Sequence, residues 1–390
     1  MRMKITALAI LPIFSIFPGR AAAQKIEMKK GLRLVHNEKI GSWGATPKVR
    51  LELVRTIGGL NVEDEHLAFK DPTDTAMDSK GCIYILDRGN ARIQKLSSDG
   101  TFLQSIGRHG QGPAEFQFPF CLAISPDDKL FVMDYHNLRI QILTPEGKME
   151  KAIKFTNSQM SKVRLLKSGD LVLGGRIYLG ELMKARKKPP DLLSIIDQKG
   201  KVLKSFGEFI DYGDLNVNSE VHWFELDVDH NDNIYVTFRY QNRIEKYFSD
   251  GTQSWRANRI LNYGTDVIDK GYLRIENDGS KVSRGPWLNT VSNGISVDNK
   301  GRIWVITQKR QLTPEERGSM ITSSGGIKRI KNPLNKATDI YKFEIFDSEG
   351  ILLGEIPIAI RATALRIFGK SLFMIGLEEA SVYEYRIIEN

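Results

Sequence analysis

The stretch DRGNARIQKL at residues 87–96 is written again as DYHNLRIQIL at residues 134–143. Asp, Asn, Arg, Ile and Gln return in the same order, 47 positions later. Self-similarity at such a spacing is typical of a repeat architecture in which each unit is one supersecondary element. Each copy is preceded by an apolar run and followed by a turn and a further run. Short runs separated by turn residues predict four strands per unit.

Weaker copies of the unit continue along the chain and predict a closed ring. Three of them contain VRLLKSGDLVLGG, FELDVDHNDNIYVTF and GISVDNKGRIWVIT, and a sixth unit shows only three strands before the chain ends. The missing strand lies at the other end, where LELVRTIG (51–58) is similar to FLQSIG (102–107), the fourth strand of unit one. We therefore predict an all-β fold, a six-bladed β-propeller with four-stranded antiparallel blades. An N-terminal strand closes the last blade, which removes open sheet edges.

These motifs resemble those of NHL-repeat proteins. The matching patterns are D-x-x-N-x-R-I-Q, the turn that leads into an IYV-type strand, and IG-x-x-G-x-G-x-x-x-F-x-x-P. The resemblance covers roughly residues 49–390 and implies a six-bladed propeller of an exported bacterial type. The later units depart from the pattern, because Phe238 and Thr307 stand in place of the motif Asp and Ser381 stands in place of the motif Arg.

The first 23 residues have the layout of a secretory signal peptide. A basic start, an apolar run and the small residues Ala21–Ala23 predict export with cleavage near Ala23. An uncleaved anchor is the alternative, but the run is short and contains Pro12 and Pro18. We expect residues 24–48 to be an N-terminal extension and residues 49–390 to be the propeller. The mature chain should be periplasmic or extracellular and should not span a membrane.

Net charge limits the kinds of partner that this chain favours, and its two cysteines limit the possible disulfide bonds. The formal net charge of +9 falls to +6 without residues 1–23, which contain three basic residues and no acidic ones. Outside the cytoplasm, a mildly basic chain favours acidic surfaces, glycans or lipid headgroups over nucleic acid. Cys82 and Cys121 are expected at opposite ends of their blades, so we predict two free and mostly buried thiols.

The repeated motif is interpreted as a structural turn between the second and third strands of a blade. Its aspartates can accept backbone N–H bonds, its asparagines tolerate a left-handed backbone, and its arginines can reach a carboxylate as a bidentate pair. A ligand site is the alternative, but recurrence at equivalent places favours the structural role. The residues are Asp87, Asn90, Arg92, Asp134, Asn137 and Arg139.

Insertions enlarge one face of the predicted ring. The two turns of a blade lie 19 residues apart in units one, two and four, but 31 apart in unit three and 49 apart in unit five. A further insertion at residues 257–290 follows unit four, and the sequence leaves open whether it adds strands. These loops open on the same side, the loop-rich face, where binding residues usually lie.

The insertions are basic, and two interpretations of their charge remain open. The lysines and arginines can be solvated surface residues, or they can hold an anionic partner such as a protein, a glycan or an envelope component. The candidate residues are Lys184, Arg186, Lys187, Lys188, Lys328, Arg329 and Lys331.

A second candidate site lies at the mouth of the central channel. His222 precedes an inner strand, and four other polar residues align near the starts of inner strands: Asp74, Lys162, Glu225 and Arg361. These side chains could bind a small ligand or form a water-filled plug.

The sequence shows no phosphate-binding loop and no G-x-S-x-G motif, and GRHGQG (107–112) and DVDHNDN (227–233) are interpreted as turns. We therefore expect a monomeric, non-enzymatic binding or scaffold module without a cofactor. The family resemblance implies an alternative, a metal-dependent lyase or lactone hydrolase. In that alternative, His109 and His222 would be ligands to zinc or calcium.

Overall fold

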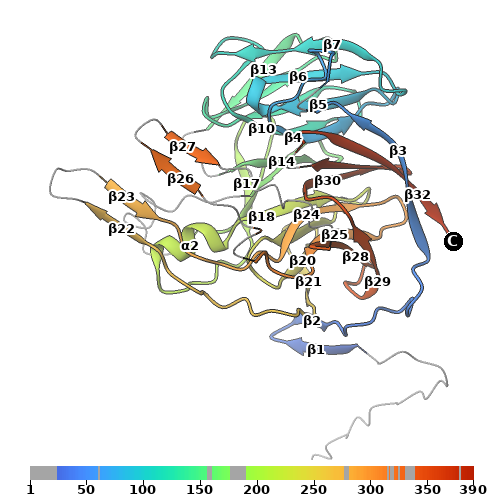
Figure 1. The fold of residues 1–390 in the computed structure, drawn as a ribbon, viewed down its shortest axis with the longest axis vertical. Coiled ribbons are helices and arrows are strands. Elements are labelled where there is room, and N and C mark those ends of the chain that lie inside the picture. Colours follow the sequence, from blue (N-terminus) through green and yellow to red (C-terminus); the bar gives the residue numbers. More distant parts are fainter. Residues whose placement is uncertain are drawn as a thin grey trace, which may run out of the picture.

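Six four-stranded antiparallel sheets surround one axis in the computed structural model of this protein (Figure 1). The predicted six-bladed β-propeller is therefore confirmed. The structure describes residues 24–59, 62–155, 160–175, 190–275, 281–313, 316, 320–323, 326–329, 339–376 and 379–390.

The blades follow one another along the chain. Blade 1 consists of β4 (Pro72–Met77), β5 (Ile83–Asp87), β6 (Arg92–Leu96) and β7 (Phe102–Ile106). Blade 2 consists of β10 (Pro119–Ile124), β11 (Leu130–Asp134), β12 (Arg139–Leu143) and β13 (Met149–Lys154). Blade 3 consists of β14 (Lys162–Leu165), β15 (Leu171–Gly174), β16 (Leu193–Ile196) and β17 (Val202–Phe206). A short parallel pair, β8 (Arg108–His109) and β9 (Glu115–Phe116), lies between blades 1 and 2.

The second half of the ring repeats this arrangement. Blade 4 consists of β18 (Phe224–Val228), β19 (Ile234–Phe238), β20 (Ile244–Tyr247) and β21 (Gln253–Asn258). Blade 5 consists of β24 (Ser292–Val297), β25 (Ile303–Gln308), β28 (Tyr341–Phe346) and β29 (Leu352–Ile358). Blade 6 consists of β30 (Ala362–Phe368), β31 (Ser371–Gly376), β32 (Val382–Glu389) and β3 (Val49–Ile57).

The hydrophobic core lies between blades. Strands such as β5 and β19 are buried at every residue, because a neighbouring blade covers each face of the sheet. Each pair of neighbouring blades shares its own apolar cluster, for example around Tyr84 and Val132 between blades 1 and 2. Ile85 and Phe373 belong to the cluster between blades 1 and 6, so the cycle of clusters is complete.

Strand β3 closes the ring, as the sequence predicted. It runs antiparallel to β32, with Val49 opposite Glu389 and Ile57 opposite Val382. A bulge between Leu53 and Arg55 leaves Val54 without a partner in the ladder. Segments more than 300 residues apart in the chain thereby share one sheet.

The N-terminal extension adds two strands that the sequence analysis did not predict. Strand β1 (Lys25–Lys29) pairs with β2 (Leu32–His36), and β2 runs parallel to β21 at the outer edge of blade 4. Asn37 then crosses to blade 5, where its Oδ1 accepts the N–H of Leu352 at 2.7 Å. The extension therefore bridges the outer edges of two blades.

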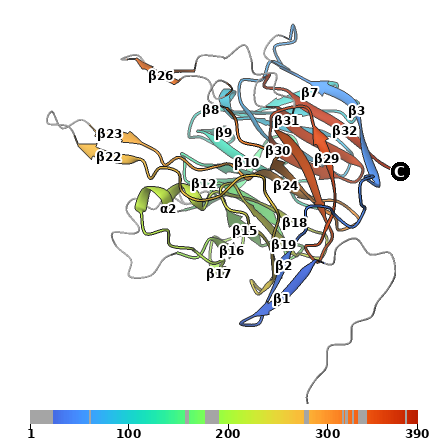
Figure 2. The ribbon, with the colours of Figure 1, turned by 60° about the horizontal axis from the view of Figure 1, so that its bottom comes forward.

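The insertions project from one side of the ring. Strand β22 (Tyr272–Ile275) pairs with β23 (Lys281–Arg284), so the 257–290 insertion does add strands. A second hairpin joins β26 (Met320–Ser323) to β27 (Gly326–Arg329) in the unit-five insertion. Both views place these hairpins on the same side of the blades (Figures 1 and 2).

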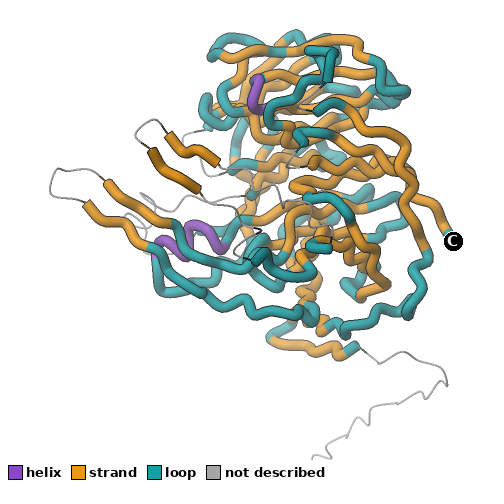
Figure 3. The backbone as a smooth tube through the Cα atoms, in the orientation of Figure 1, coloured by secondary structure: helices purple, strands orange, loops and turns teal. Residues whose placement is uncertain are grey.

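A helix that the sequence analysis did not predict lies on this side as well. Helix α2 (Leu215–Val221) precedes blade 4 and stands out among the strands in Figure 3. Asp214 begins it, because its carboxylate accepts the N–H groups of Asn216 and Val217. Within the described residues, no helix is long and apolar enough to cross a bilayer.

Candidate binding site at the channel mouth

The axis of the ring is filled by one polar side chain from each inner strand. Arg366 Nε lies 2.9 Å from Asp74 Oδ1, and Arg164 Nε lies 3.4 Å from Asp227 Oδ1. The six residues, in blade order, are Asp74, Cys121, Arg164, Asp227, Ser296 and Arg366. Aspartates and arginines alternate around the axis, and their ion pairs compensate for desolvation.

Cys121 and Ser296 complete this axial cluster as hydrogen-bonding partners. Cys121 Sγ lies 3.1 Å from Asp74 Oδ2 and accepts a 3.0 Å bond from Arg164 Nη1. Burial raises the pKa of the Cys121 thiol to about 11, so the group is neutral at pH 7. Burial also raises the pKa of Asp227, although the charge of Arg164 and the hydrogen bond from Ser296 act to lower it. The cluster is a polar plug built from paired groups.

The five predicted mouth residues take four different places, that of His222 being the end of helix α2. Asp74 belongs to the plug, 1% exposed. Lys162 and Glu225 come together as an ion pair at 2.7 Å, with the ammonium 5.5 Å from the Phe120 ring. Arg361 instead lines a separate cavity on the loop-rich face. The five predicted residues therefore do not form one site.

His222 lies at the end of helix α2 and is fully buried. Its Nδ1 donates to the carbonyl of Asn218 at 3.0 Å, and its Nε2 accepts the N–H of Ile210 at 3.1 Å. The ring stacks on Phe209 with a 4.0 Å centroid separation. Burial lowers the pKa of His222 to about 4. Both ring nitrogens therefore form hydrogen bonds within the protein, and the imidazole joins helix α2 to the Ile210 backbone ahead of blade 4.

No group of three or more His, Cys, Asp or Glu side chains within the described residues could hold a metal ion. The other histidine of the metal alternative, His109, is exposed in the short strand β8 between blades 1 and 2. The metal alternative therefore gains no geometric support from the arrangement of His109 and His222.

A polar cavity of about 280 Å³ opens on the loop-rich face over blade 5. Its volume is at the small end of the range for ligand pockets. None of the described residues that line it is acidic; they are Arg239, Trp287, Leu288, Thr290, Asn293, Gln308, Gln311, Leu312, Tyr341, Arg361, Ala362 and Thr363. The described lining thus includes two arginines, Arg239 and Arg361.

Arg239 is held in place by aromatic rings. Its guanidinium carbon lies 4.6 Å from the Trp223 ring centre and 5.7 Å from the Tyr240 ring centre. Its Nε is buried and has no hydrogen-bond partner among the described residues. The same is true of Oδ1 of Asn293, which is 5% exposed. Unsatisfied polar atoms in a cavity are places where a ligand or ordered water binds.

Arg239 was not predicted, because it follows β19, where Phe238 replaces the motif Asp and the repeat loses its register. The position of Arg239 directly after a second strand could have identified it from the sequence. Residues that follow second strands reach the loop-rich face, and Arg239 is a charged residue in such a place.

In blades 1 and 2, the repeated turn motif ties the loop that precedes the blade to the blade itself. Asp134 accepts from the backbone N–H of Gln117 at 2.7 Å and from Asn137 and Arg139 at 2.8 Å each. Arg139 is not a bidentate partner of the carboxylate, because its Nη2 donates to loop carbonyls, including that of Glu115.

Asp87 accepts from Lys70 N, Asp71 N, Asn90 and Arg92. The expectation of left-handed asparagines is wrong by one residue. Ala91 and Leu138 have φ values of 52° and 50°, while the preceding asparagine amides bind the motif carboxylates.

The basic insertion residues are only partly placed. Lys184, Arg186, Lys187, Lys188 and Lys331 lie outside the described residues, and Lys328 and Arg329 are placed only as backbone of β27. Cys82 and Cys121 are free thiols, as predicted, although Cys82 is only half-buried.

Comparison with known proteins supports the repeat assignment over part of the chain. No family model matches the chain. NHL repeat-containing protein 3 of Homo sapiens is 29% identical over 138 residues, which cover 34% of this chain and 40% of that protein. Its Mus musculus counterpart is 29% identical over 124 residues, or 30% and 35% of the two chains. The chain thus matches less than half the length of these relatives.

Two solved structures share the fold over nearly their whole length. A Bacteroides fragilis protein for which export has been suggested has a TM-score of 0.57 at 11% identity, covering 92% of this chain and 99% of that chain. A DUF4221 family member from Bacteroides vulgatus has a TM-score of 0.57 at 11% identity, covering 88% and 99%. At this identity the likeness shows the fold alone. The chain is therefore a six-bladed β-propeller with local similarity to NHL repeat-containing proteins.

Proposed function

We propose that this protein is an exported, non-enzymatic binding module that holds an anionic group at its loop-rich face. The observation that carries the proposal is the cavity lined by Arg239, whose buried Nε has no hydrogen-bond partner among the described residues. Guanidinium groups are suited to carboxylates and phosphates, because their planar donors match these anions. The proposal of export rests on the composition of residues 1–23.

The chemistry of the cavity favours a carboxylate carried on a ring of sugar size. Arg239 supplies charge, Asn293 supplies a buried amide, and Trp287 adds a half-exposed indole at the wall. Sugar rings and aromatic rings pack face to face with little entropy loss for the rigid indole. An acidic glycan or acidic side chains of an envelope protein would present such groups.

Binding of glucuronate and of glucuronate-terminated oligosaccharides, measured by titration calorimetry against glucose, tests the proposal. We expect the Arg239→Gln change to weaken glucuronate binding by about tenfold or more, and Arg239→Lys to recover part of the loss. The matched control is Arg50→Gln, which removes one charge from an exposed side chain of β3.

Equal binding of glucose and glucuronate, or equal losses in the Arg239 and Arg50 variants, would contradict the anion site. One equivalent of zinc or calcium in the purified protein would instead support the metal-dependent lyase or lactone hydrolase.

A further inference from the structure

The outer edge of blade 5 is only partly covered by the N-terminal extension. Ser42 and Trp43 donate backbone bonds of 3.0 and 2.7 Å to the carbonyls of Leu352 and Leu353, at the start of β29. Trp43 also covers Gly354, where a Cβ atom would lie 2.6 Å from its ring. The extension then turns away and rejoins the ring at β3. Beyond Gly354, the edge of β29 has no strand beside it in the described chain.

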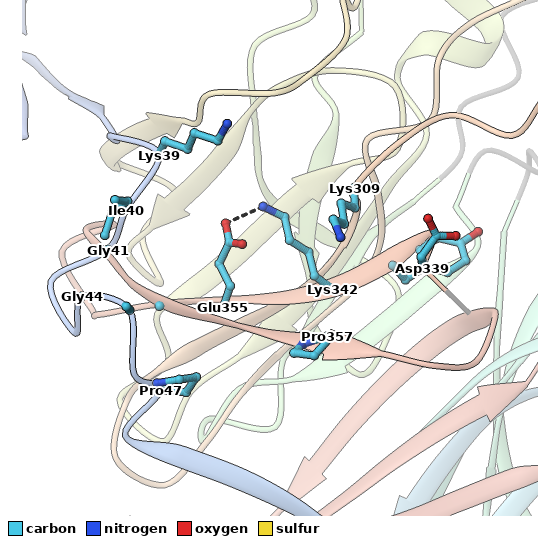
Figure 4. A pocket seen from close by; sticks show the side chains of 13 residues that line it. Lys39, Ile40, Gly41, Gly44, Pro47, Lys309, Asp339, Lys342, Glu355 and Pro357 are labelled. Atoms are coloured by element: carbon cyan, nitrogen blue, oxygen red, sulfur yellow. Dashed lines mark hydrogen bonds and ion pairs between the residues drawn. The ribbon is translucent and has the colours of Figure 1, made fainter. Parts of the chain in front are cut away.

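Two cavities flank this uncovered edge, one on each face of the sheet. The first, of about 690 Å³, contains the lysine side chains shown in Figure 4 together with Glu355 and Pro357. The second, of about 470 Å³, is lined largely by apolar groups, including Leu51, Ile356 and Tyr385. Pro47 and Pro357 line both cavities, so both reach the edge of β29 at Pro357.

The ladder register shows which backbone groups of β29 point outward. Pro357 lies opposite Lys342 and has no N–H, so this pair is not a hydrogen-bonded pair. Bonded and non-bonded pairs alternate in an antiparallel ladder, so Glu355 also directs its N–H and C=O away from β28. Leu353 lies two positions before Glu355, and its carbonyl likewise points away from β28, where it accepts the N–H of Trp43. One N–H and two C=O groups are thus open to a further strand.

The first cavity favours acidic side chains. Lys39 and Lys309 are exposed, and their side-chain amines make no hydrogen bond or ion pair to any described residue. The carboxylates nearby are already engaged, since Asp339 binds Arg310 and Glu355 binds Lys342. Figure 4 shows the Lys342–Glu355 contact and the separate amines of Lys39 and Lys309.

We propose that the free edge of β29 takes an extended segment of a partner protein as an added strand. Side chains of a strand alternate between faces. The segment would therefore place acidic residues beside Lys39 and Lys309, and apolar residues beside Leu51 and Tyr385. Blade 4 already carries such an addition, because β2 lengthens it beyond β21. Edge strands with pockets on both faces recognise peptides in this way.

The test uses a blocked eight-residue peptide of alternating Glu and Val, with a Lys and Val peptide as comparison, measured by fluorescence polarisation on the full chain. Glu355→Pro removes the outward N–H without touching a ladder bond, and Glu355→Ala is its matched control. We expect Glu355→Pro to weaken binding about tenfold relative to Glu355→Ala. The exposed pair Lys39→Ser and Lys309→Ser should also weaken binding, by about fivefold at low salt.

Similar affinities in the two Glu355 variants would overturn the strand-addition model, as would equal binding of the two peptides. So would the absence of binding at millimolar peptide. Self-association of the unmodified chain that Glu355→Pro abolishes, without peptide binding, would replace the partner by a second copy of the chain. Circular dichroism and melting of each variant separate these outcomes from misfolding.

Discussion

His222 shows how burial and local bonding set the behaviour of one residue. Its ring donates to Asn218 and accepts from Ile210, so one neutral tautomer satisfies both partners. Protonation would place a second N–H against the Ile210 amide and a charge in an apolar surrounding. A histidine in this position contributes to folding rather than to chemistry.

Acidification should therefore destabilise the protein through His222. In the unfolded chain the imidazole titrates near its usual pKa of ~6.5, while in the fold its pKa is about 4. The unfolded state binds more protons in this window, so stability is full above pH ~6.5 and is lost as the pH falls toward 4. The loss should be on the order of 2 kcal/mol by pH 5.

Urea unfolding between pH 7 and pH 4.5 measures this effect. The comparison is His222→Gln, whose amide can donate and accept but does not titrate. The difference in unfolding free energy between the two proteins should change with pH, and a constant difference would contradict the assignment.

At the scale of elements, hydrogen bonds from one residue, Asn37, help to fix the N-terminal extension to blades 4 and 5. Asn37 is 3% exposed and joins three backbone groups of two blades. Its Nδ2 donates to Gly350 O at 2.9 Å and Asn258 O at 3.1 Å, and its Oδ1 accepts from Leu352. Strands β1 and β2 therefore depend on this residue for their position against blade 5.

Replacing Asn37 by Ala should loosen the extension without unfolding the ring. Buried hydrogen-bonding groups left without a partner cost about 1–3 kcal/mol. This cost should lower the free energy of locally opening β1 and β2. Hydrogen exchange followed by mass spectrometry should show faster exchange in residues 25–36 and unchanged exchange in β19. Glu38→Ala serves as the control, and equal exchange in both variants would argue against this role.

Elements that arise from local sequence patterns could be predicted, whereas elements that depend on partners far away in the chain could not. The motif at 87–96 predicted blades because turn residues and apolar runs repeat in sequence. Strands β1 and β2 were not predicted, because β1 is exposed along its whole length and β2 pairs with the distant strand β21. The axial partners Arg164 and Arg366 were missed for a similar reason, since each pairs with an acid in another blade.

At the scale of the molecule, the axial cluster and the inter-blade clusters couple all six blades. Asp74 binds Arg366 across the contact of blades 1 and 6 and lies 3.7 Å from Arg164 of blade 3. Its carboxylate also accepts the N–H of Leu122 in blade 2 at 3.2 Å. A change at this residue should therefore affect the whole ring.

Asp74→Ala should destabilise the protein by about 3–5 kcal/mol, because the buried guanidinium of Arg366 loses its carboxylate and that of Arg164 keeps only Asp227. Chemical denaturation followed by tryptophan fluorescence measures the change. The control, Glu52→Ala, removes an exposed carboxylate of β3 and should shift stability by less than about 0.5 kcal/mol. A loss of similar size in both variants would show that the plug adds no stability.

The pairing of β3 with β32 has a consequence for biosynthesis. Residues 49–57 leave the ribosome first among the ring strands, yet their partner at residues 382–389 is made last. Through nearly the whole of translation, this strand, with Leu51, Leu53 and Val54 among its residues, must stay unpaired without adhering to another nascent chain. Holding factors that bind this segment early would determine the yield of native protein, and slowing the final codons should increase aggregation.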